Sequence, residues 1–369
     1  MKFLFLEPFF GGSHRDFARG LTDHSRHDIT LLTLPDRFWK WRMRGAALYF
    51  AQTIHPPVAY DGIVTTDLMS LSDLKMLLGP NLPPALVYFH ENQITYPLAQ
   101  GEMRDVQFGF TDITTALAAD RVLFNSRTHF DDFFSALPAF LKMMPEFHPL
   151  WVIDAIKEKA NILHPGCSFQ AGEPEIEKPD VGPPLIIWNH RWEFDKNPVD
   201  FFAALDAVLN RGLEFRLALL GENFQKIPKP FISAKERLGD RIVCYGYEKS
   251  RKTYRNWLKK GAIVISTAFQ ENFGISMVEA IRHGCLPLLP DRLAYPEILP
   301  RMFHDRFLYA SRRDLEEKLA ALISGYGNFI GVRKPLARTM EKYAWELMAP
   351  RYDRELDELV SGSSLKICK

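Results

Sequence analysis

The chain has 369 residues, of which 47% are apolar and 13% aromatic, so it can bury far more surface than one small core requires, and its length suggests about two domains. With 46 Lys and Arg residues against 45 Asp and Glu residues, no overall field attracts it to nucleic acid or to an anionic membrane, and any such attraction must be local. The four cysteines include no Cys-x-x-Cys pair, which argues against both a disulfide framework and a structural zinc site.

The N-terminal stretch MKFLFLEPFFGG favours a cytoplasmic protein. It reaches Glu7 and Pro8 too soon for a secretory signal, and no run approaches the roughly 18 apolar residues of a membrane span. We therefore expect a protein of a reducing, cytoplasmic compartment with no stable membrane association; no feature indicates an oligomeric state.

Short apolar segments separated by helix-length stretches recur in two series along the chain. The first comprises KFLFLEP, DITLLTLP, DGIVTTD, ALVYFHEN, RVLFNS and NILHPG, and the second PLIIWNHR, FRLALLGE, RIVCYGY, GAIVISTA and LPLLPD. Such runs are typical of buried parallel strands. We expect an α/β protein with doubly wound parallel-sheet domains at 1–168 and 185–340, a Pro-, Gly- and Glu-rich linker at 169–184, and C-terminal helices and a tail at 341–369.

In such sheets ligands bind beyond the carboxyl ends of the strands, so the polar residues after each apolar run are candidate site residues. EPFFGGSHRDF places Gly11 and Gly12 after the first strand and Ser13, next to His14, as the expected N-cap of a helix. The glycines suggest a backbone that approaches a ligand, and a tight strand-to-helix turn explains them equally well.

The segment PDRFWKWRMRGAALYFAQTI predicts an amphipathic helix. Its apolar face would contain Trp39, Met43, Ala46 and Phe50, and its other face Arg37, Lys40, Trp41 and Arg44. Cations beside an aromatic ring suit RNA phosphates and an unstacked base. A helix lying on a membrane surface and a merely solvated face remain alternatives.

A further strand exit, VYFHENQITYP, carries His90, Glu91, Asn92 and Gln93. A lone histidine is usually structural, but three hydrogen-bonding neighbours at a carboxyl-end position favour a binding site.

The stretch AFQENFGISMVEAIRHG carries Glu271 and Glu279 at the junction of a buried strand, expected to end near Ala268, and a helix. The backbone N–H groups of Phe273, Gly274 and Ile275 would form an anion site, strengthened by the helix dipole, with Asn272 beside it. Carboxylates accept hydrogen bonds from sugar hydroxyls. The pattern therefore predicts a diphosphate site between two sugars, against the alternative of two solvated glutamates.

The eight-residue spacing of these glutamates, followed by GCLPLLP, resembles the donor-site signature of retaining glycosyltransferases with the GT-B fold. That resemblance implies two Rossmann-like domains with the active site in the cleft between them. It also implies that Glu271 contacts the transferred sugar and Glu279 the nucleotide ribose. Arg191 and Lys196 in IIWNHRWEFDKNP match the Arg/Lys pair on the donor diphosphate, although an exposed pair at a helix start is the simpler alternative. The base would lie near LLGENF at 219–224 and CYGYEKS at 244–250, which include Gly221 and Tyr247.

The N-terminal stretches LEPFFGGSHRDF, KWRMRGAALYF, VYFHENQITYP and VLFNS resemble the tRNA-queuosine α-mannosyltransferase family. This resemblance implies transfer of mannose from GDP-mannose to the cyclopentenediol of queuosine in the anticodon loop of tRNA(Asp). It makes a queuosine-carrying tRNA the partner and a nucleotide sugar the second substrate. The acceptor-side residues would then be Ser13, His14, Arg37, Lys40, Trp41, Arg44, Glu91 and Asn92.

No Asp-x-Asp sequence occurs, so we expect neither a metal nor a cofactor, with Arg191, Lys196 and the helix start at 273–275 stabilising the leaving diphosphate. No second carboxylate is placed as a nucleophile, so front-face retention is the natural hypothesis. The leaving phosphate would take the acceptor proton, and His90 would orient the sugar at its 6-hydroxyl. The alternatives are a lipid or glycan acceptor, a sugar-nucleotide epimerase, and a nonenzymatic RNA-binding protein.

Overall fold

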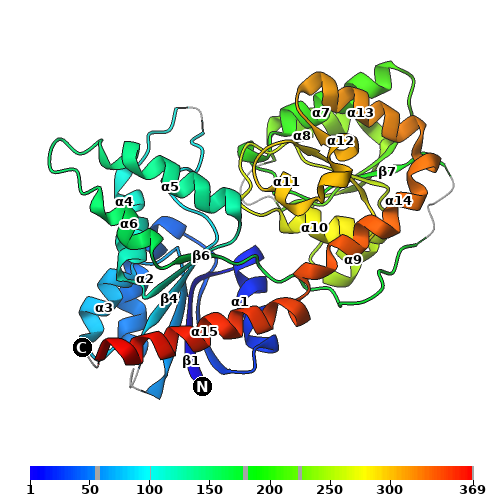
Figure 1. Ribbon diagram of the computed structural model, residues 1–369. Helices are drawn as coiled ribbons and strands as arrows, with labels where there is room; N and C mark the ends of the chain where they lie inside the picture. Colours follow the sequence, from blue (N-terminus) through cyan, green and yellow to red (C-terminus); the bar gives the residue numbers. More distant parts are fainter. Residues whose placement is uncertain (55–58, 100, 178–181, 223–226, 368–369) are drawn as a thin grey trace. The chain divides into compact units, whose positions relative to one another are not determined.

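The computed structural model describes residues 1–54, 59–99, 101–177, 182–222 and 227–367 (Figure 1). The chain forms two compact units. Unit 1 comprises Met1–Gln170 together with Tyr343–Lys369, and unit 2 comprises Ala171–Lys342. The C-terminal helix therefore belongs to the same unit as the N-terminus.

Unit 1 is built on a parallel sheet of six strands in the order β2-β1-β3-β4-β5-β6. Its strands are rich in apolar residues, and β4 (ALVYF) is buried throughout, because helices cover both faces. Leu4 of the first strand, for example, pairs with Ile63 of the third. The strand bounds are β1 (Lys2–Phe10), β2 (Asp28–Pro35), β3 (Gly62–Thr66), β4 (Ala85–Phe89), β5 (Arg121–Phe124) and β6 (Ala160–Ile162).

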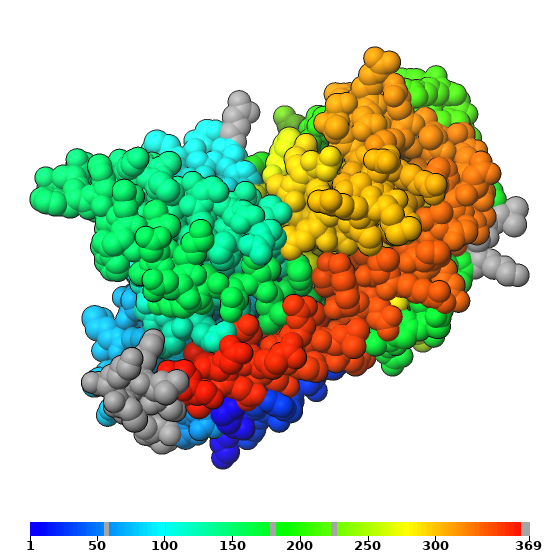
Figure 2. Space-filling view, in the orientation of Figure 1, coloured from blue at the N-terminus to red at the C-terminus, as the bar shows by residue number. Residues whose placement is uncertain are grey.

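Two large hydrophobic clusters fill most of the space between this sheet and its helices, beside a smaller one around Met43. One, around Phe17 and Tyr352, lies beneath α1 and α15, which run side by side in Figures 1 and 2. The other, around Phe50 and Phe133, lies beneath the remaining helices. The helix bounds are α1 (Gly12–His24), α2 (Trp39–Thr53), α3 (Leu71–Leu78), α4 (Val106–Ala118), α5 (Arg127–Leu141), α6 (Trp151–Lys157) and α15 (Trp345–Ile367).

Unit 2 contains a second six-stranded parallel sheet, in the order β12-β11-β10-β7-β8-β9. Its strands are β7 (Leu185–Trp188), β8 (Arg216–Leu219), β9 (Ile242–Tyr245), β10 (Ile263–Ile265), β11 (Leu286–Pro290) and β12 (Leu308–Tyr309). The strand before Glu271 ends at Ile265, earlier than the expected Ala268, although residues 266–268 remain buried.

The helices of unit 2 alternate with these strands. They are α7 (Pro198–Asn210), α8 (Lys229–Leu238), α9 (Arg251–Lys260), α10 (Ile275–Arg282), α11 (Tyr295–Ile298), α12 (His304–Phe307), α13 (Arg312–Ser324) and α14 (Tyr326–Thr339). Short 3₁₀ helices are η2 (Phe194–Lys196), η3 (Gly239–Arg241), η4 (Arg301–Phe303) and η5 (Glu341–Tyr343).

The first part of the expected linker packs onto unit 2. Glu173 pairs with Lys334 at 2.9 Å and with Arg338 at 2.6 Å, and Arg282 donates to the carbonyl of Gly172 at 2.8 Å. Residues 178–181 of that linker lie outside the described residues.

The strand order reverses direction between β1 and β3 in unit 1 and between β7 and β10 in unit 2. Ligands of open α/β sheets bind at such switch points, beyond the carboxyl ends of the strands. Among the described residues, no helix has the length and apolar character needed to cross a membrane.

Candidate active site

In unit 2, Glu271 lies in the loop between β10 and α10 and is held at both carboxylate oxygens. One oxygen accepts from the Gly274 N–H at 3.0 Å, and the other lies 3.4 Å from Lys196 Nζ. Lys196 also donates to the Gln270 carbonyl at 2.7 Å and lies 3.1 Å from Asp195. Burial would lower the pKa of Lys196, but Glu271 and Asp195 outweigh it and raise that pKa above its ordinary value. Lys196 therefore stays charged and fixes the Glu271 loop.

The start of α10 differs from the expected anion site. Gly274 is the N-cap, with a φ of 94° that favours glycine, and its N–H is occupied by the Glu271 carboxylate. The prediction of three available N–H groups at 273–275 is therefore wrong for Gly274. The first helical residues, Ile275 and Ser276, retain the N–H groups that precede the intrahelical bonds. Phe273 is buried, and the side-chain oxygen of Asn272 accepts from the Gln270 side-chain amide at 2.9 Å.

Glu279 is positioned on α10 by residues that the sequence did not identify. Tyr254 Oη donates to its carboxylate at 3.3 Å, and Arg251 Nη1 lies 3.3 Å away. Asn189, directly after β7, donates to the same Tyr254 oxygen at 3.0 Å and to the Ser276 carbonyl at 2.9 Å. Burial, and then Glu279, raise the pKa of Tyr254 well above its ordinary value, so the hydroxyl keeps its proton. Asn189 could have been identified from the sequence as a polar residue directly after an apolar run, whereas no sequence pattern marked Tyr254.

The expected Arg/Lys pair occupies two different environments. The Arg191 side chain is 45% exposed and pairs with Glu193 at 3.2 Å, whereas Lys196 is buried. An exposed guanidinium can turn toward a ligand; the Lys196 ammonium is already enclosed by carboxylates.

Gly221 and Tyr247 were assigned only to a region for the base. A Cβ on Gly221 would lie 1.8 Å from the carbonyl oxygen of His190, so glycine is required for the loop after β8 to pass the loop after β7. Tyr247 is 48% exposed. Residues 223–226, part of the expected 219–224 segment, lie outside the described residues.

In unit 1, helix α1 begins at Gly12 with Gly11 as its N-cap. The expectation that Ser13 caps this helix is therefore wrong: Ser13 is an exposed residue of the first turn. A Cβ on Gly11 would collide with the Asp36 side chain, and Gly12 has a φ of 49°. Both glycines are thus explained by the strand-to-helix turn itself.

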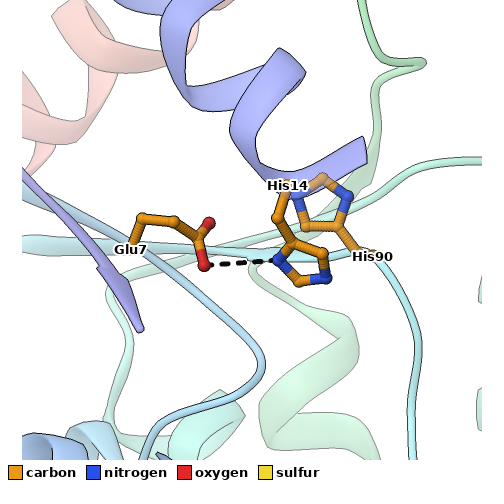
Figure 3. A group of neighbouring side chains, drawn as sticks. All are labelled: Glu7, His14 and His90. Carbon is orange, nitrogen blue, oxygen red and sulfur yellow. Dashed lines mark ion pairs between the residues drawn. The ribbon is translucent and has the colours of Figure 1, made fainter. Parts of the chain in front are cut away.

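The carboxyl ends of β1 and β4 bring together Glu7, His14 and His90 (Figure 3). His14 Nδ1 lies 3.3 Å from a Glu7 oxygen, and the rings of His14 and His90 lie against each other with centroids 4.1 Å apart. Burial lowers the pKa of His14, but Glu7, together with Asp67 and Glu91, outweighs burial and raises that pKa to about 9. Burial, and then the charge on His14, hold the pKa of His90 well below its ordinary value. A charged His14 therefore stands beside a neutral His90 at neutral pH.

The backbone N–H and carbonyl of His90 are also held by hydrogen bonds. Its N–H donates to Asp67 at 2.8 Å, and its carbonyl accepts from Asn125 at 2.9 Å. Asp67 follows β3, and its burial raises its pKa to about 7 against the opposing effect of His14. These groups were not identified from the sequence because they come from strands far apart in the chain.

Glu7, His14 and His90 each offer one atom that could bind a metal, all within 4.8 Å of one another. Glu7 is paired with His14 and accepts from the Phe9 N–H at 2.8 Å, and the two imidazole rings are tilted by 37° to each other (Figure 3). A metal needs ring nitrogens directed at one point. The described side chains form an ion pair between Glu7 and His14 with the His90 ring tilted against His14.

Two expected acceptor-side residues point inward. His14 is only 7% exposed, and Asn92 only 1%. The side-chain oxygen Oδ1 of Asn92 accepts from the N–H groups of Ile94 and Thr95 at 3.1 and 2.9 Å, so Asn92 stabilises a turn. An outward contact with RNA is therefore wrong for both. Glu91 is half-buried and accepts from Gln93 at 3.1 Å.

Helix α2 presents the expected two faces, with one correction. Its apolar residues Met43, Ala46 and Phe50 are buried and Trp39 is half-buried, as predicted. Lys40, Trp41 and Arg44 are exposed on the helix, Trp41 to 75%. Arg37 precedes the helix, because Phe38 adopts a left-handed conformation (φ 58°) and α2 begins only at Trp39.

Comparison with known proteins places these features in a family. Residues 2–167 match the family described as tRNA-queuosine alpha-mannosyltransferase N-terminal, and residues 170–345 match glycosyl transferases group 1. The chain is 37% identical over 327 residues to the tRNA-queuosine alpha-mannosyltransferase of Drosophila melanogaster, covering 86% of this chain and 85% of that protein.

Solved structures with low identity establish the fold. A sucrose-phosphate synthase from Thermosynechococcus elongatus has a TM-score of 0.75 at 13% identity, with 98% of this chain and 100% of that chain covered. HepE of Anabaena in complex with UDP and glucose has a TM-score of 0.66 at 15% identity, with 97% and 99% covered. The two parallel sheets are thus those of a GT-B glycosyltransferase. On the identity that spans both units, the chain belongs to the tRNA-queuosine alpha-mannosyltransferase family.

Proposed function

We propose that the chain transfers mannose from GDP-mannose to queuosine in the anticodon loop of tRNA(Asp), with retention of anomeric configuration, in the cytoplasm. The observation that carries the proposal is the 37% identity to the Drosophila tRNA-queuosine alpha-mannosyltransferase, which runs through both units. A donor unit alone would leave the acceptor open, whereas the N-terminal match extends over residues 2–167.

The donor would bind beyond the carboxyl ends of β7 and β10 in unit 2. Glu271 would accept hydrogen bonds from the transferred sugar and Glu279 from the nucleotide ribose, since carboxylates pair well with hydroxyls. Lys196 and Tyr254 support these roles because each holds one of the two carboxylates in place. The exposed Arg191 and the N–H groups at the start of α10 would face the diphosphate.

We assign no metal to this reaction because the chain has no Asp-x-Asp sequence. Arg191 and Lys196 would instead offset the charge that grows on the leaving diphosphate. In a front-face reaction, an oxygen of that diphosphate takes the proton of the attacking queuosine hydroxyl. The new glycosidic bond forms on the face from which the diphosphate leaves.

His90 would hydrogen-bond the mannose 6-hydroxyl and orient it. A neutral imidazole can both donate and accept, and the low pKa of His90 supports that form. The exposed Lys40, Trp41 and Arg44 of α2 would contact the tRNA through phosphates and a base.

The test is incubation of the protein with queuosine-containing or queuosine-free tRNA and either GDP-mannose or another sugar nucleotide, followed by mass analysis of the nucleosides. We expect a gain of one hexose only with queuosine and GDP-mannose together. Glu271→Gln and His90→Ala should lose most of this activity, whereas Glu317→Gln on the exposed side of α13 should keep it.

Other products would refute the proposal. Hexose on queuosine-free tRNA would exclude queuosine as the acceptor, and hexose on a lipid or glycan alone would exclude tRNA. Conversion of the sugar nucleotide without any acceptor would indicate an epimerase. Full activity of Glu271→Gln or His90→Ala would remove that residue from the site.

A further inference from the structure

Unit 2 contains a strongly cationic segment, KSRKTYRNWLKK at residues 249–260. Six of its residues are Lys or Arg and none is Asp or Glu, in a chain whose formal net charge is only +1. The six are Lys249, Arg251, Lys252, Arg255, Lys259 and Lys260. The segment 37–44 at the start of α2 is the counterpart in unit 1, with four cations and no acid.

Helix stability does not explain these charges. Arg251 and Lys252 occupy the first turn of α9, where the helix dipole disfavours cations. Only Lys259 and Lys260 lie in the last turn, where cations are favoured. The ion pair with Glu279 compensates Arg251, so the cost of Lys252 is the one that suggests that the helix face serves a ligand.

The apolar side of α9 is used for packing. Leu258 is buried and Tyr254 and Trp257 are half-buried, while Lys252, Arg255 and Asn256 are exposed. The exposed three follow the i, i+3, i+4 spacing of one helix face. Within the described part of the chain, Lys252 has no carboxylate at ion-pair distance. The face is therefore cationic and without an apolar stripe that could enter a membrane.

The same helix reaches the candidate donor site from its other side. Arg251 and Tyr254 contact Glu279, one turn or less from the exposed cations. A polyanion on the outer face of α9 would thus be held next to the residue proposed to bind the nucleotide ribose.

We infer that the exposed face of α9, formed by Lys252, Arg255 and Asn256 and flanked by Lys249 and Lys260, binds phosphates of the tRNA substrate. The inference rests on the proposed function, which supplies an RNA acceptor. A nearly neutral protein must bind RNA through local patches, and phosphate contacts by Lys and Arg provide sequence-independent affinity. The face would contribute affinity for tRNA and no selectivity for queuosine.

The test compares Lys252→Ala/Arg255→Ala with Arg301→Ala/Arg306→Ala, a control that removes the same charge from exposed positions elsewhere in unit 2. Binding of queuosine-containing and queuosine-free tRNA is measured over a series of KCl concentrations, together with the KM values for tRNA and GDP-mannose. We expect the substitutions on α9 to weaken binding of both tRNAs roughly tenfold. The slope of log affinity against log salt concentration should fall by the amount that about two phosphate contacts contribute. The KM for GDP-mannose and the thermal stability should match those of the control.

The outcomes separate this inference from the proposed function. A wild-type protein that neither binds nor modifies tRNA refutes the proposed function. A wild-type protein that modifies tRNA, with an α9 variant indistinguishable from the control, overturns the α9 inference alone. The inference also fails if the variant raises only the KM for GDP-mannose, or if it loses binding to anionic phosphatidylserine vesicles while tRNA binding is unchanged.

Discussion

Replacing Glu7 by Gln tests whether this carboxylate keeps a proton on His14. The Gln oxygen can still accept from the Phe9 N–H and from Thr66, so the local hydrogen bonds are kept while the charge is removed. Burial lowers the pKa of His14 and Glu7 reverses that effect. Without that charge, burial offsets most of the rise, and we expect the pKa of His14 to fall back toward its ordinary value of 6.5.

The size of the effect on stability follows from the shift of the His14 pKa from 6.5 to about 9. At about 1.4 kcal/mol per pKa unit, the protonated histidine contributes about 3 kcal/mol to the free energy of unfolding. Because the pKa is raised in the folded state, this contribution is fully present below pH 6.5 and is lost as the pH rises through about 9. Asp67 and Glu91 also raise the pKa of His14, so Glu7→Gln should remove most of the shift but not all of it.

The assay has two readouts. The first is NMR titration of protein labelled with ¹⁵N at histidine, with the His14 signal identified by its loss in His14→Asn. The second is denaturant unfolding at pH 6 and pH 9.5, where the advantage of the wild type over Glu7→Gln should shrink at the higher pH. Glu346→Gln, an exposed glutamate on α15, is the control and should leave the titration unchanged. A wild-type His14 that titrates near 6.5, or the same titration in Glu7→Gln, would refute the reasoning.

Two further predictions concern unit 2. Gly221→Ala places a Cβ 1.8 Å from the His190 carbonyl and should cost about 1–3 kcal/mol in thermal unfolding, whereas Gly331→Ala, with open space on α14, should change stability by less than about 1 kcal/mol. Equal melting temperatures for the two variants would contradict the required close approach. Tyr254→Phe removes the hydroxyl that donates to Glu279 and should raise the KM for GDP-mannose about threefold to tenfold, with tRNA affinity unchanged. An unchanged KM would show that Glu279 needs no such support.

The strands were predictable because their signal is local. Each of the eleven apolar runs corresponds to a strand, since parallel strands covered on both faces show continuous apolar sequence. The twelfth strand, β12, was missed because two residues, Leu308 and Tyr309, give no periodicity. The order of strands within each sheet depends on pairings between distant segments, which no local pattern records.

The same distinction explains the candidate site. Glu271 and Glu279 were identifiable because they flank a strand exit and a helix start within one short stretch. The contact of Tyr254 with Glu279 and that of His14 with Glu7 depend on how the chain folds back. Asn92 misled the prediction because its type and position suit a turn as well as a ligand.

Each of the two switch points contains a buried ion pair, and a role in function explains these pairs better than a gain in stability does. In each unit, a carboxylate near the end of a strand faces a buried cation: Glu7 with His14 in unit 1, and Glu271 with Lys196 in unit 2. Buried ion pairs are expensive to desolvate and are often no more stabilising than apolar residues of the same size. Their benefit is a charge held in a fixed place before a substrate arrives, which avoids reorganisation during the reaction.

The two ion pairs differ in the pH at which the cation loses its proton, because the pKa of Lys196 is raised above an ordinary value of 10.5 whereas that of His14 is about 9. As the pH rises from neutrality, His14 therefore loses its proton before Lys196 does, and the ring beside His90 becomes neutral.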